Sequence, residues 1–131
     1  MSRISVGPIE HLINATRYSF QGLRYAWANE AAFRYECYVL AVALPAGWLL
    51  GKGAVERALL IGSVLLVVVV ELINSAIETT VDRVGKESNE LSGHAKDFAS
   101  AAVFVSIVAA AIVWLVLLWL KKKFAAGSIR L

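Results

Sequence analysis

The chain has 131 residues, of which 59% are hydrophobic and only 18% are charged, and its formal net charge is +3. Soluble domains are about 45–50% apolar and spread their charges over the whole surface, whereas this chain has long uncharged stretches. Its length allows one domain, 1–131. A single cysteine, Cys37, excludes an internal disulfide. The composition argues against a soluble enzyme, a disordered chain and a disulfide-rich secreted protein, and it favours an all-α membrane protein.

The first element expected is an amphipathic surface helix over about residues 9–28. Its polar residues recur at helical spacings of four, three, four and three, with apolar residues on the other side. The polar stripe consists of Glu10, Asn14, Arg17, Gln21 and Arg24. Pro8 suits the first turn. Beside a membrane such a helix lies in the interface plane, where it either anchors the chain or covers a site at the surface.

A first membrane span is expected over about residues 31–51. Only 15 uncharged residues separate Glu36 from Lys52, and Pro45 and Gly47 interrupt them. The segment is therefore either a short buried helix or a kinked span that includes Ala31–Phe33 upstream.

Two longer spans follow, over about residues 58–81 and 98–120. The last contains 23 uncharged residues, enough to cross a bilayer core at about 1.5 Å per residue. Trp114 and Trp119 lie near its end, where interfacial aromatic residues are expected, and Lys121–Lys123 terminate it.

Signals for the membrane and for its orientation are weaker. The first 30 residues contain no continuous apolar core of a signal peptide, so we expect an inner-membrane or plasma-membrane protein that keeps its first segment. With the N-terminus inside, seven Lys and Arg residues, including Arg3, would be cytoplasmic, and six, including Arg130, would be outside. This bias is too small to fix the topology.

The second span carries one polar face on an otherwise apolar helix. Glu71, Asn74, Ser75 and Glu78 are spaced i, i+3, i+4 and i+7. A carboxylate inside a span costs about 2.5–3.5 kcal/mol on insertion scales, so this face must meet protein, water or ligand. It either joins helices through polar contacts or forms a functional site.

Spacing separates the roles of the two glutamates. Seven residues place their backbones about 10.5 Å apart along the axis, too far to grip one ion together. Glu78 needs another donor, such as Glu30, and oxygen ligands of this kind favour Mg²⁺ with substrate phosphates. Glu71, deeper in the bilayer, suits a substrate group that arrives from lipid.

Residues 82–97 form the most polar part of the chain and contain no Walker-type glycine loop. They bring Lys96 close to the Glu78 end of the second span. Lys96 near a helix N-terminus is either a phosphate clamp or part of a solvated loop.

Four short motifs make the chain resemble the bacterial integral-membrane diacylglycerol kinases. They are Asn29–Arg34, Glu71–Glu78, Asp82-Arg83 and Ala95–Asp97. The likeness extends from about His11 to Trp119 and includes the length and the order of three spans.

The resemblance implies a lipid kinase that transfers the γ-phosphoryl group of Mg-ATP to diacylglycerol, giving phosphatidic acid in phospholipid recycling. It also implies a homotrimer with active sites shared between subunits at the cytoplasmic face of the inner membrane. The partners expected are therefore ATP with Mg²⁺, a membrane lipid and two further copies of the chain.

By position, the resemblance assigns Glu71 as catalytic base, beside Asn74, and Glu30 and Glu78 as metal ligands. The nucleotide contacts that it implies are His11, Tyr18, Glu30, Glu78, Glu87, Ser88, Asn89, Lys96 and Asp97. The lipid contacts that it implies are Arg34, Glu71, Ser100, Trp114 and Trp119. His11 stands where the family usually has arginine, and Asn89 and His94 replace more usual loop residues. We expect these differences to affect the affinity for ATP rather than the reaction.

Three alternatives remain at this point. The nearest is an undecaprenol kinase of the same fold. A small ion or proton channel subunit, with Glu71 and Glu78 lining a pore, belongs to another class. The third is a structural membrane protein whose polar face only fixes assembly.

Overall fold

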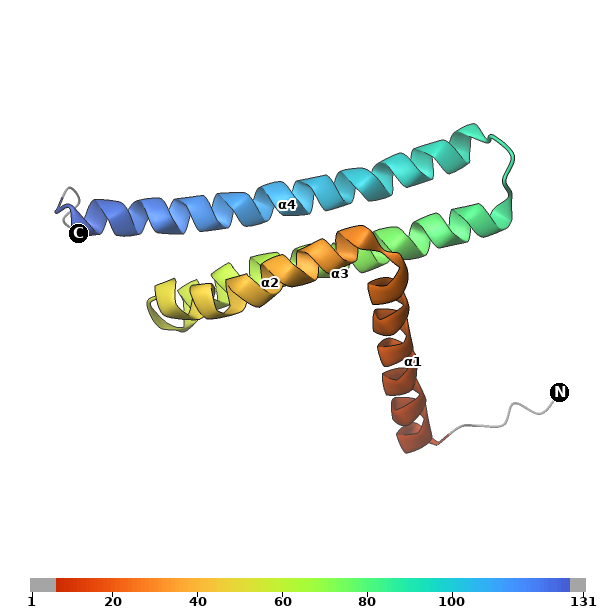
Figure 1. Ribbon diagram of the computed structural model, residues 1–131, viewed down its shortest axis with the longest axis horizontal. Coiled ribbons are helices and arrows are strands. Elements are labelled where there is room, and N and C mark those ends of the chain that lie inside the picture. The colour runs from red at the N-terminus through yellow and green to blue at the C-terminus, as the bar shows by residue number, and fades with distance from the viewer. Residues whose placement is uncertain (1–6, 128–131) are drawn as a thin grey trace.

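The computed structural model describes residues 7–127, which form four α-helices. Helix α1 comprises Pro8–Asn29, α2 Ala31–Leu50, α3 Gly53–Val84 and α4 Glu90–Ala125. Helices α2, α3 and α4 run along one another, and α3 packs against both of the others (Figure 1). Helix α1 turns away from this bundle and runs crosswise to it (Figure 1).

The predicted elements all appear, with modest shifts at their ends. The surface helix expected over 9–28 is α1, and Pro8 occupies its first turn. The segment expected over 31–51 is α2, which begins at Ala31, continues through Pro45 and ends one residue earlier than predicted. The spans expected over 58–81 and 98–120 lie within longer helices. Both ends of the predicted domain, with Arg3 and Arg130 of the charge count, lie outside the described residues.

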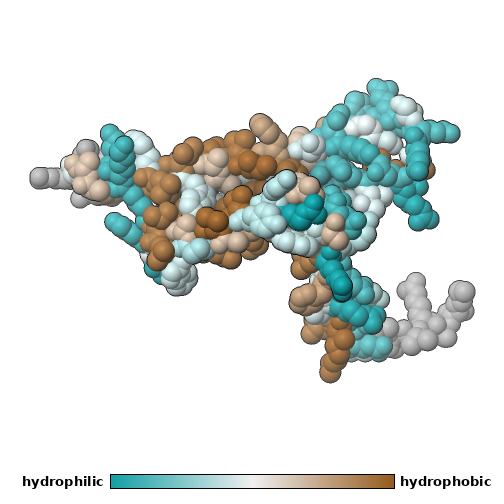
Figure 2. All heavy atoms as spheres, in the orientation of Figure 1, coloured by the Kyte–Doolittle hydropathy of each residue, from teal (hydrophilic) through white to brown (hydrophobic). Residues whose placement is uncertain are grey.

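Two helices, α3 and α4, are long and apolar enough to cross a membrane. Helix α2 is not one of them, and it carries the charged residues Arg34 and Glu36 near its start. The first predicted span, over residues 31–51, therefore stays a prediction. Figure 2 shows apolar atoms along the middle of the bundle and hydrophilic atoms at both ends. Length, composition and this distribution indicate a membrane protein.

The buried core of the single chain is narrow. Ala26, Phe33 and Val68 form a cluster at the corner where α1 and α2 meet α3, and Cys37, Leu40 and Leu72 pack against it. Most large apolar side chains elsewhere are exposed. An apolar surface of this extent is stable only when lipid or another chain covers it.

The turn between α2 and α3 is held by Arg57. Its Nε donates hydrogen bonds to the carbonyl oxygens of Trp48 and Gly51, at 3.0 and 3.3 Å. Its guanidinium also lies 4.3 Å from the centre of the Trp48 ring. At the start of α3, the backbone N–H of Lys52 donates to Oε2 of Glu56 at 2.8 Å. These contacts fix how α2 returns into α3.

Helix α4 is attached to α3 near the same end. The indole Nε1 of Trp114 donates to the carbonyl oxygen of Leu60 at 3.0 Å, and Leu60 is the one large side chain fully buried in the described chain. Lys121 forms an ion pair with Glu56 at 3.3 Å. The turn and α4 therefore share contacts with the first two turns of α3.

Gly51 is required by space rather than by an unusual backbone angle. A Cβ at this position would lie 2.6 Å from Cγ of Arg57 and 2.8 Å from the carbonyl oxygen of Gly47. We expect Gly51→Ala to lower the free energy of unfolding by about 1–3 kcal/mol through overpacking. Reversible unfolding in mixed detergent micelles measures this change.

Gly62→Ala on α3 is the matched control, because a Cβ there meets no atom within 4 Å. That substitution should leave the stability unchanged or raise it, since alanine favours a helix over glycine. Equal stability of the two alanine variants would show that the turn yields to the extra methyl group.

Candidate active site

The polar face predicted on the second span lies on α3 and is largely buried. Glu71 is 5% exposed and Asn74 is 9% exposed, although both lie on a helix that is otherwise strongly apolar. Nδ2 of Asn74 donates to Oε1 of Glu78 at 3.3 Å, whereas its buried Oδ1 has no hydrogen-bond partner among the described residues. The face thus holds a buried carboxyl group and an amide oxygen that is free to accept a hydrogen bond.

Glu30 approaches this face from the junction of α1 and α2. It is the single residue between the two helices, and its extended backbone (φ −108°, ψ 107°) makes the chain turn there. Its N–H donates to the carbonyl oxygen of Ala26 at 2.8 Å, which closes the end of α1. Glu30 also lines a cavity of about 690 Å³ between α1 and α3, with Ser75 and Thr79 across it.

Three carboxylates, Glu30, Glu71 and Glu78, influence one another electrostatically here, and Lys96 is a cation on which the charge of Glu78 also acts. The charges of Glu30 and Glu78 both act on Glu71. In residues 7–127, however, no three His, Cys, Asp or Glu side chains lie close enough to hold a metal ion together. Glu30 and Glu78 can therefore hold a divalent cation only with oxygen ligands from elsewhere, such as water or phosphate.

A fourth carboxylate, Glu36 on α2, was not among the site residues predicted from the sequence. It interacts electrostatically with Glu71, and its Oε2 is buried without a hydrogen-bond partner in the described chain. It borders a cavity of about 200 Å³ between α2, α3 and α4. Its position inside the expected first span was a usable signal, because a carboxylate in a span requires a reason.

The connection between α3 and α4 forms a separate polar pocket of about 490 Å³. Its lining includes Lys86, Glu87, Ser88, Asn89 and Lys96. Asn89 is also the N-cap of α4. Its Oδ1 accepts hydrogen bonds from the backbone N–H groups of Leu91 and Ser92, at 2.9 and 3.2 Å. The loop residues predicted to contact nucleotide thus lie together around one pocket.

Lys96 lies at the end of this pocket nearest Glu78, as expected, but its partner is Asp82. Its Nζ donates to Oδ1 of Asp82. This hydrogen bond raises the pKa of Lys96, which precedes the uncharged stretch of α4, so the ammonium stays charged throughout the neutral range. An anion that binds Lys96 must compete with one exposed carboxylate.

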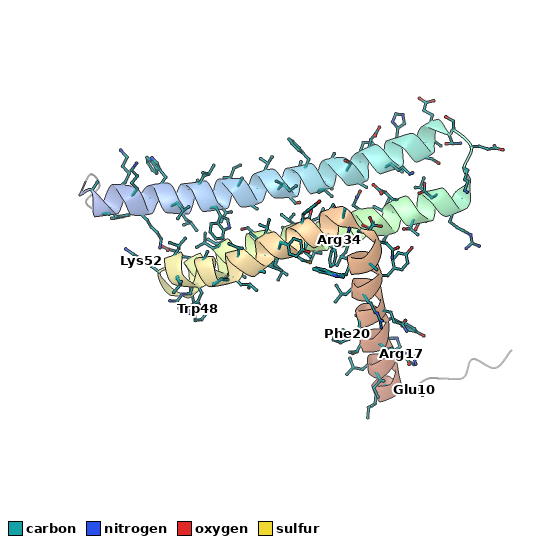
Figure 3. All side chains as sticks on the ribbon, in the orientation of Figure 1. Glu10, Arg17, Phe20, Arg34, Trp48 and Lys52 are labelled. Atoms are coloured by element: carbon teal, nitrogen blue, oxygen red, sulfur yellow. The ribbon has the colours of Figure 1, made fainter. Side chains whose placement is uncertain are left out.

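The remaining predicted residues are more dispersed. Nη1 of Arg34 donates to the carbonyl oxygen of Trp27 at 2.7 Å, which braces the corner between α1 and α2. His11 and Tyr18 are exposed on α1, and Figure 3 places neighbouring Glu10 and Arg17 away from the bundle. Asp97 and Ser100 are exposed at the start of α4. Within residues 7–127, no hydrogen bond or ion pair joins any of these four residues to Glu30, Glu71 or Glu78.

Trp114 and Trp119 lie at the opposite end of α4. Trp114 bonds to Leu60 near the α2–α3 turn, and Trp119 is exposed. An apolar cavity of about 610 Å³ lies between α2, α3 and α4, and Trp114 borders it together with Tyr38 and Val64. The lining of this cavity is almost entirely apolar, and the phenol of Tyr38 is its one titratable group among the described residues.

The site therefore combines two chemical capacities. Crowded carboxylates can bind a divalent cation that carries an anionic ligand. A buried carboxylate beside apolar surface can accept a proton from a weakly acidic group that reaches it through the membrane. The nearby lysine pocket adds a place for a phosphate group.

Comparison with known proteins agrees with these features. The model of the family described as prokaryotic diacylglycerol kinase matches residues 17–118. The chain is 52% identical to the diacylglycerol kinase of Haemophilus influenzae over 106 residues, 81% of this chain and 90% of the relative. It is 53% identical to that of Escherichia coli K12 over 108 residues, 82% of this chain and 88% of the relative. A third relative, the diacylglycerol kinase of Pseudomonas aeruginosa PAO1, is 44% identical over 110 residues, 84% of this chain and 89% of that protein. The chain belongs to the prokaryotic diacylglycerol kinase family.

Proposed function

We propose that this protein is an ATP-dependent lipid kinase that phosphorylates the free hydroxyl of diacylglycerol and yields phosphatidic acid for phospholipid recycling. The observation that carries the proposal is the buried carboxyl of Glu71, on the apolar helix α3, in a chain whose relatives are named diacylglycerol kinase. A lipid alcohol can reach such a group without leaving the bilayer.

Glu71 acts as the base in this proposal. Phosphoryl transfer depends mostly on positioning and on charge neutralisation, so a weak base suffices. The hydroxyl oxygen forms a bond to the γ-phosphorus while the bond from that phosphorus to the β–γ bridging oxygen breaks. ADP leaves, and the hydroxyl proton passes to Glu71 late in the step. Asn74 lies one helical turn away, and its buried Oδ1 has no hydrogen-bond partner within residues 7–127.

Glu30 and Glu78 fit a magnesium ion that arrives with ATP. Each is only partly buried, and Asn74 holds one oxygen of Glu78. Mg²⁺ bound there with ATP would offset the charge of the phosphates and the repulsion among the carboxylates. The observation in favour of this assignment is the concentration of negative charge, which a divalent cation relieves.

Lys96 exchanges Asp82 for a phosphate oxygen in the nucleotide-bound protein. The exchange is inexpensive, because exposed ion pairs contribute only about 0–1 kcal/mol. Glu87, Ser88, Asn89 and Asp97 complete the nucleotide side, and α1 contributes His11 and Tyr18. Both are exposed on α1, which runs crosswise to the bundle (Figure 1), so their contribution fits a homotrimer in which sites are shared between subunits.

The lipid side comprises Arg34 at the corner between α1 and α2, and Ser100, Trp114 and Trp119 along α4. We further propose that α2 spans the membrane together with α3 and α4. The protein would then reside in the inner membrane with its active site at the cytoplasmic face. The apolar surfaces left exposed in one chain support both lipid contact and trimer assembly.

A transfer assay tests the function directly. Purified protein receives γ-labelled Mg-ATP with diacylglycerol or with undecaprenol in separate reactions. Label in phosphatidic acid supports the proposal. Label only in undecaprenyl phosphate would assign the same chemistry to another lipid alcohol. Transfer to neither by well-folded protein would contradict a lipid kinase function.

We expect Glu71→Gln to lower kcat for lipid phosphorylation by about 10²–10⁴-fold, because the amide cannot accept the hydroxyl proton. Initial rates of phosphatidic acid formation measure the loss. Glu10→Gln on exposed α1 is the control and should retain full activity. Full activity of Glu71→Gln would remove this residue from the role of base.

We expect Glu78→Gln to raise the Mg²⁺ concentration required for half-maximal activity by at least tenfold, since a neutral amide is a weaker ligand for a hard cation. A magnesium titration at fixed ATP measures the shift, again with Glu10→Gln for comparison. An unchanged magnesium requirement would place the metal elsewhere.

A further inference from the structure

Positive charge gathers at the end of the bundle opposite the candidate active site. We call the following set the far basic cluster: Lys52, Arg57, Lys121, Lys122 and Lys123. The only carboxylate at this end of the described chain is Glu56, which pairs with Lys121. Five cations against one carboxylate leave a net charge of +4. Figure 2 shows hydrophilic atoms at this end beside apolar ones, and Figure 3 labels Lys52 and Trp48 there.

Arg57 is held in a fixed position within the cluster. Its Nε is bound to two carbonyl oxygens, its guanidinium stacks on Trp48, and Gly51 leaves room for its stem. Its other guanidinium nitrogens make no hydrogen bond within residues 7–127. An arginine in this state presents donors to an anion with little loss of conformational freedom on binding.

Tryptophan side chains place the cluster at the level of lipid headgroups. Nζ of Lys123 lies 5.6 Å from the centre of the Trp119 ring, and Trp48 is exposed beside Arg57. Tryptophan is enriched at the membrane–water interface. The uncharged residues 98–120 separate the cluster from the Lys96 end of α4 by about 35 Å at 1.5 Å per residue, roughly one hydrocarbon core.

We propose that the far basic cluster binds the phosphate of anionic phospholipids, such as phosphatidylglycerol, in the leaflet opposite the active site. Exposed apolar side chains precede the cluster in the sequence, Leu49 on α2 and Leu115 on α4, and can contact the acyl chains of the same lipid. A soluble anion would use the charges alone, whereas a lipid uses charge, tryptophan and apolar surface together. This binding is independent of phosphoryl transfer.

Native mass spectrometry of the full chain in neutral detergent tests the proposal. The protein is titrated separately with phosphatidylglycerol and phosphatidylcholine of equal chain length. We expect phosphatidylglycerol to bind about tenfold more tightly, and the triple variant Arg57→Gln, Lys122→Gln, Lys123→Gln to lose that preference. Equal affinity of the unmodified protein for both lipids would overturn the proposal.

Two control variants test whether the lipid preference depends on the charge of the cluster, rather than on the total charge of the protein or on a folding defect. Arg24→Gln with Arg83→Gln and Lys86→Gln also removes three charges, but at the other end, and should retain the preference. The double variant Lys122→Arg, Lys123→Arg keeps the charge and should also retain it. Loss of preference in the distant variant, or its persistence in the variant of the cluster, would contradict the assignment. Displacement of bound phosphatidylglycerol by millimolar inorganic phosphate would contradict a lipid site.

Discussion

The structure depends on burying one carboxyl group, that of Glu71, on the otherwise apolar helix α3. Glu71 is almost fully buried on α3, where a lipid-facing carboxylate would cost about 2.5–3.5 kcal/mol or more. Its helix therefore cannot stand alone in the bilayer with that face outward. The corner formed by Ala26 and Phe33 covers α3 beside Glu71, and Glu30 and Glu78 add negative charge rather than neutralise it. The fold thus holds mutually repelling carboxylates close together. In the proposed function, a cation bound with substrate would reduce this repulsion.

The two ends of the helix bundle carry different groups. The carboxylates lie where α1 crosses the bundle, and the lysine pocket lies just beyond them in the α3–α4 connection. Trp114 and Arg57 instead attach the helices to one another at the other end. The two ends thus have different contacts, with hydrogen bonds from Trp114 and Arg57 at one and the cluster of Ala26, Phe33 and Val68 beside the carboxylates at the other.

Helical periodicity was sufficient to predict α1, the long apolar helices and the polar face of α3. It could not predict partners that depend on tertiary contact. Lys96 was expected near Glu78, and it does lie at that end, but the intervening loop also brings Asp82 to it. From the sequence, Glu36 only marked the border of an uncharged stretch. Packing of α2 on α3 brings it close enough to Glu71 for the two carboxylates to interact electrostatically.

The site residues divide along the same line. Glu71, Asn74 and Glu78 share one helix, so spacing alone was enough to place them together. His11 and Tyr18 lie on a helix whose direction no periodicity specifies, and α1 leads away from the carboxylates of its own chain. Gly51 could not be interpreted from sequence either, because its role arises from the closeness of the Arg57 side chain.

The short α2–α3 turn also bears on how the chain enters a membrane. Only Gly51 and Lys52 separate the two helices, so the Leu50 end of α2 lies beside the first turn of α3 wherever α3 lies. In the proposed arrangement, with α2 as a further span, this turn makes α2 and α3 one hairpin. The hairpin rather than the single helix would then be the unit that leaves water.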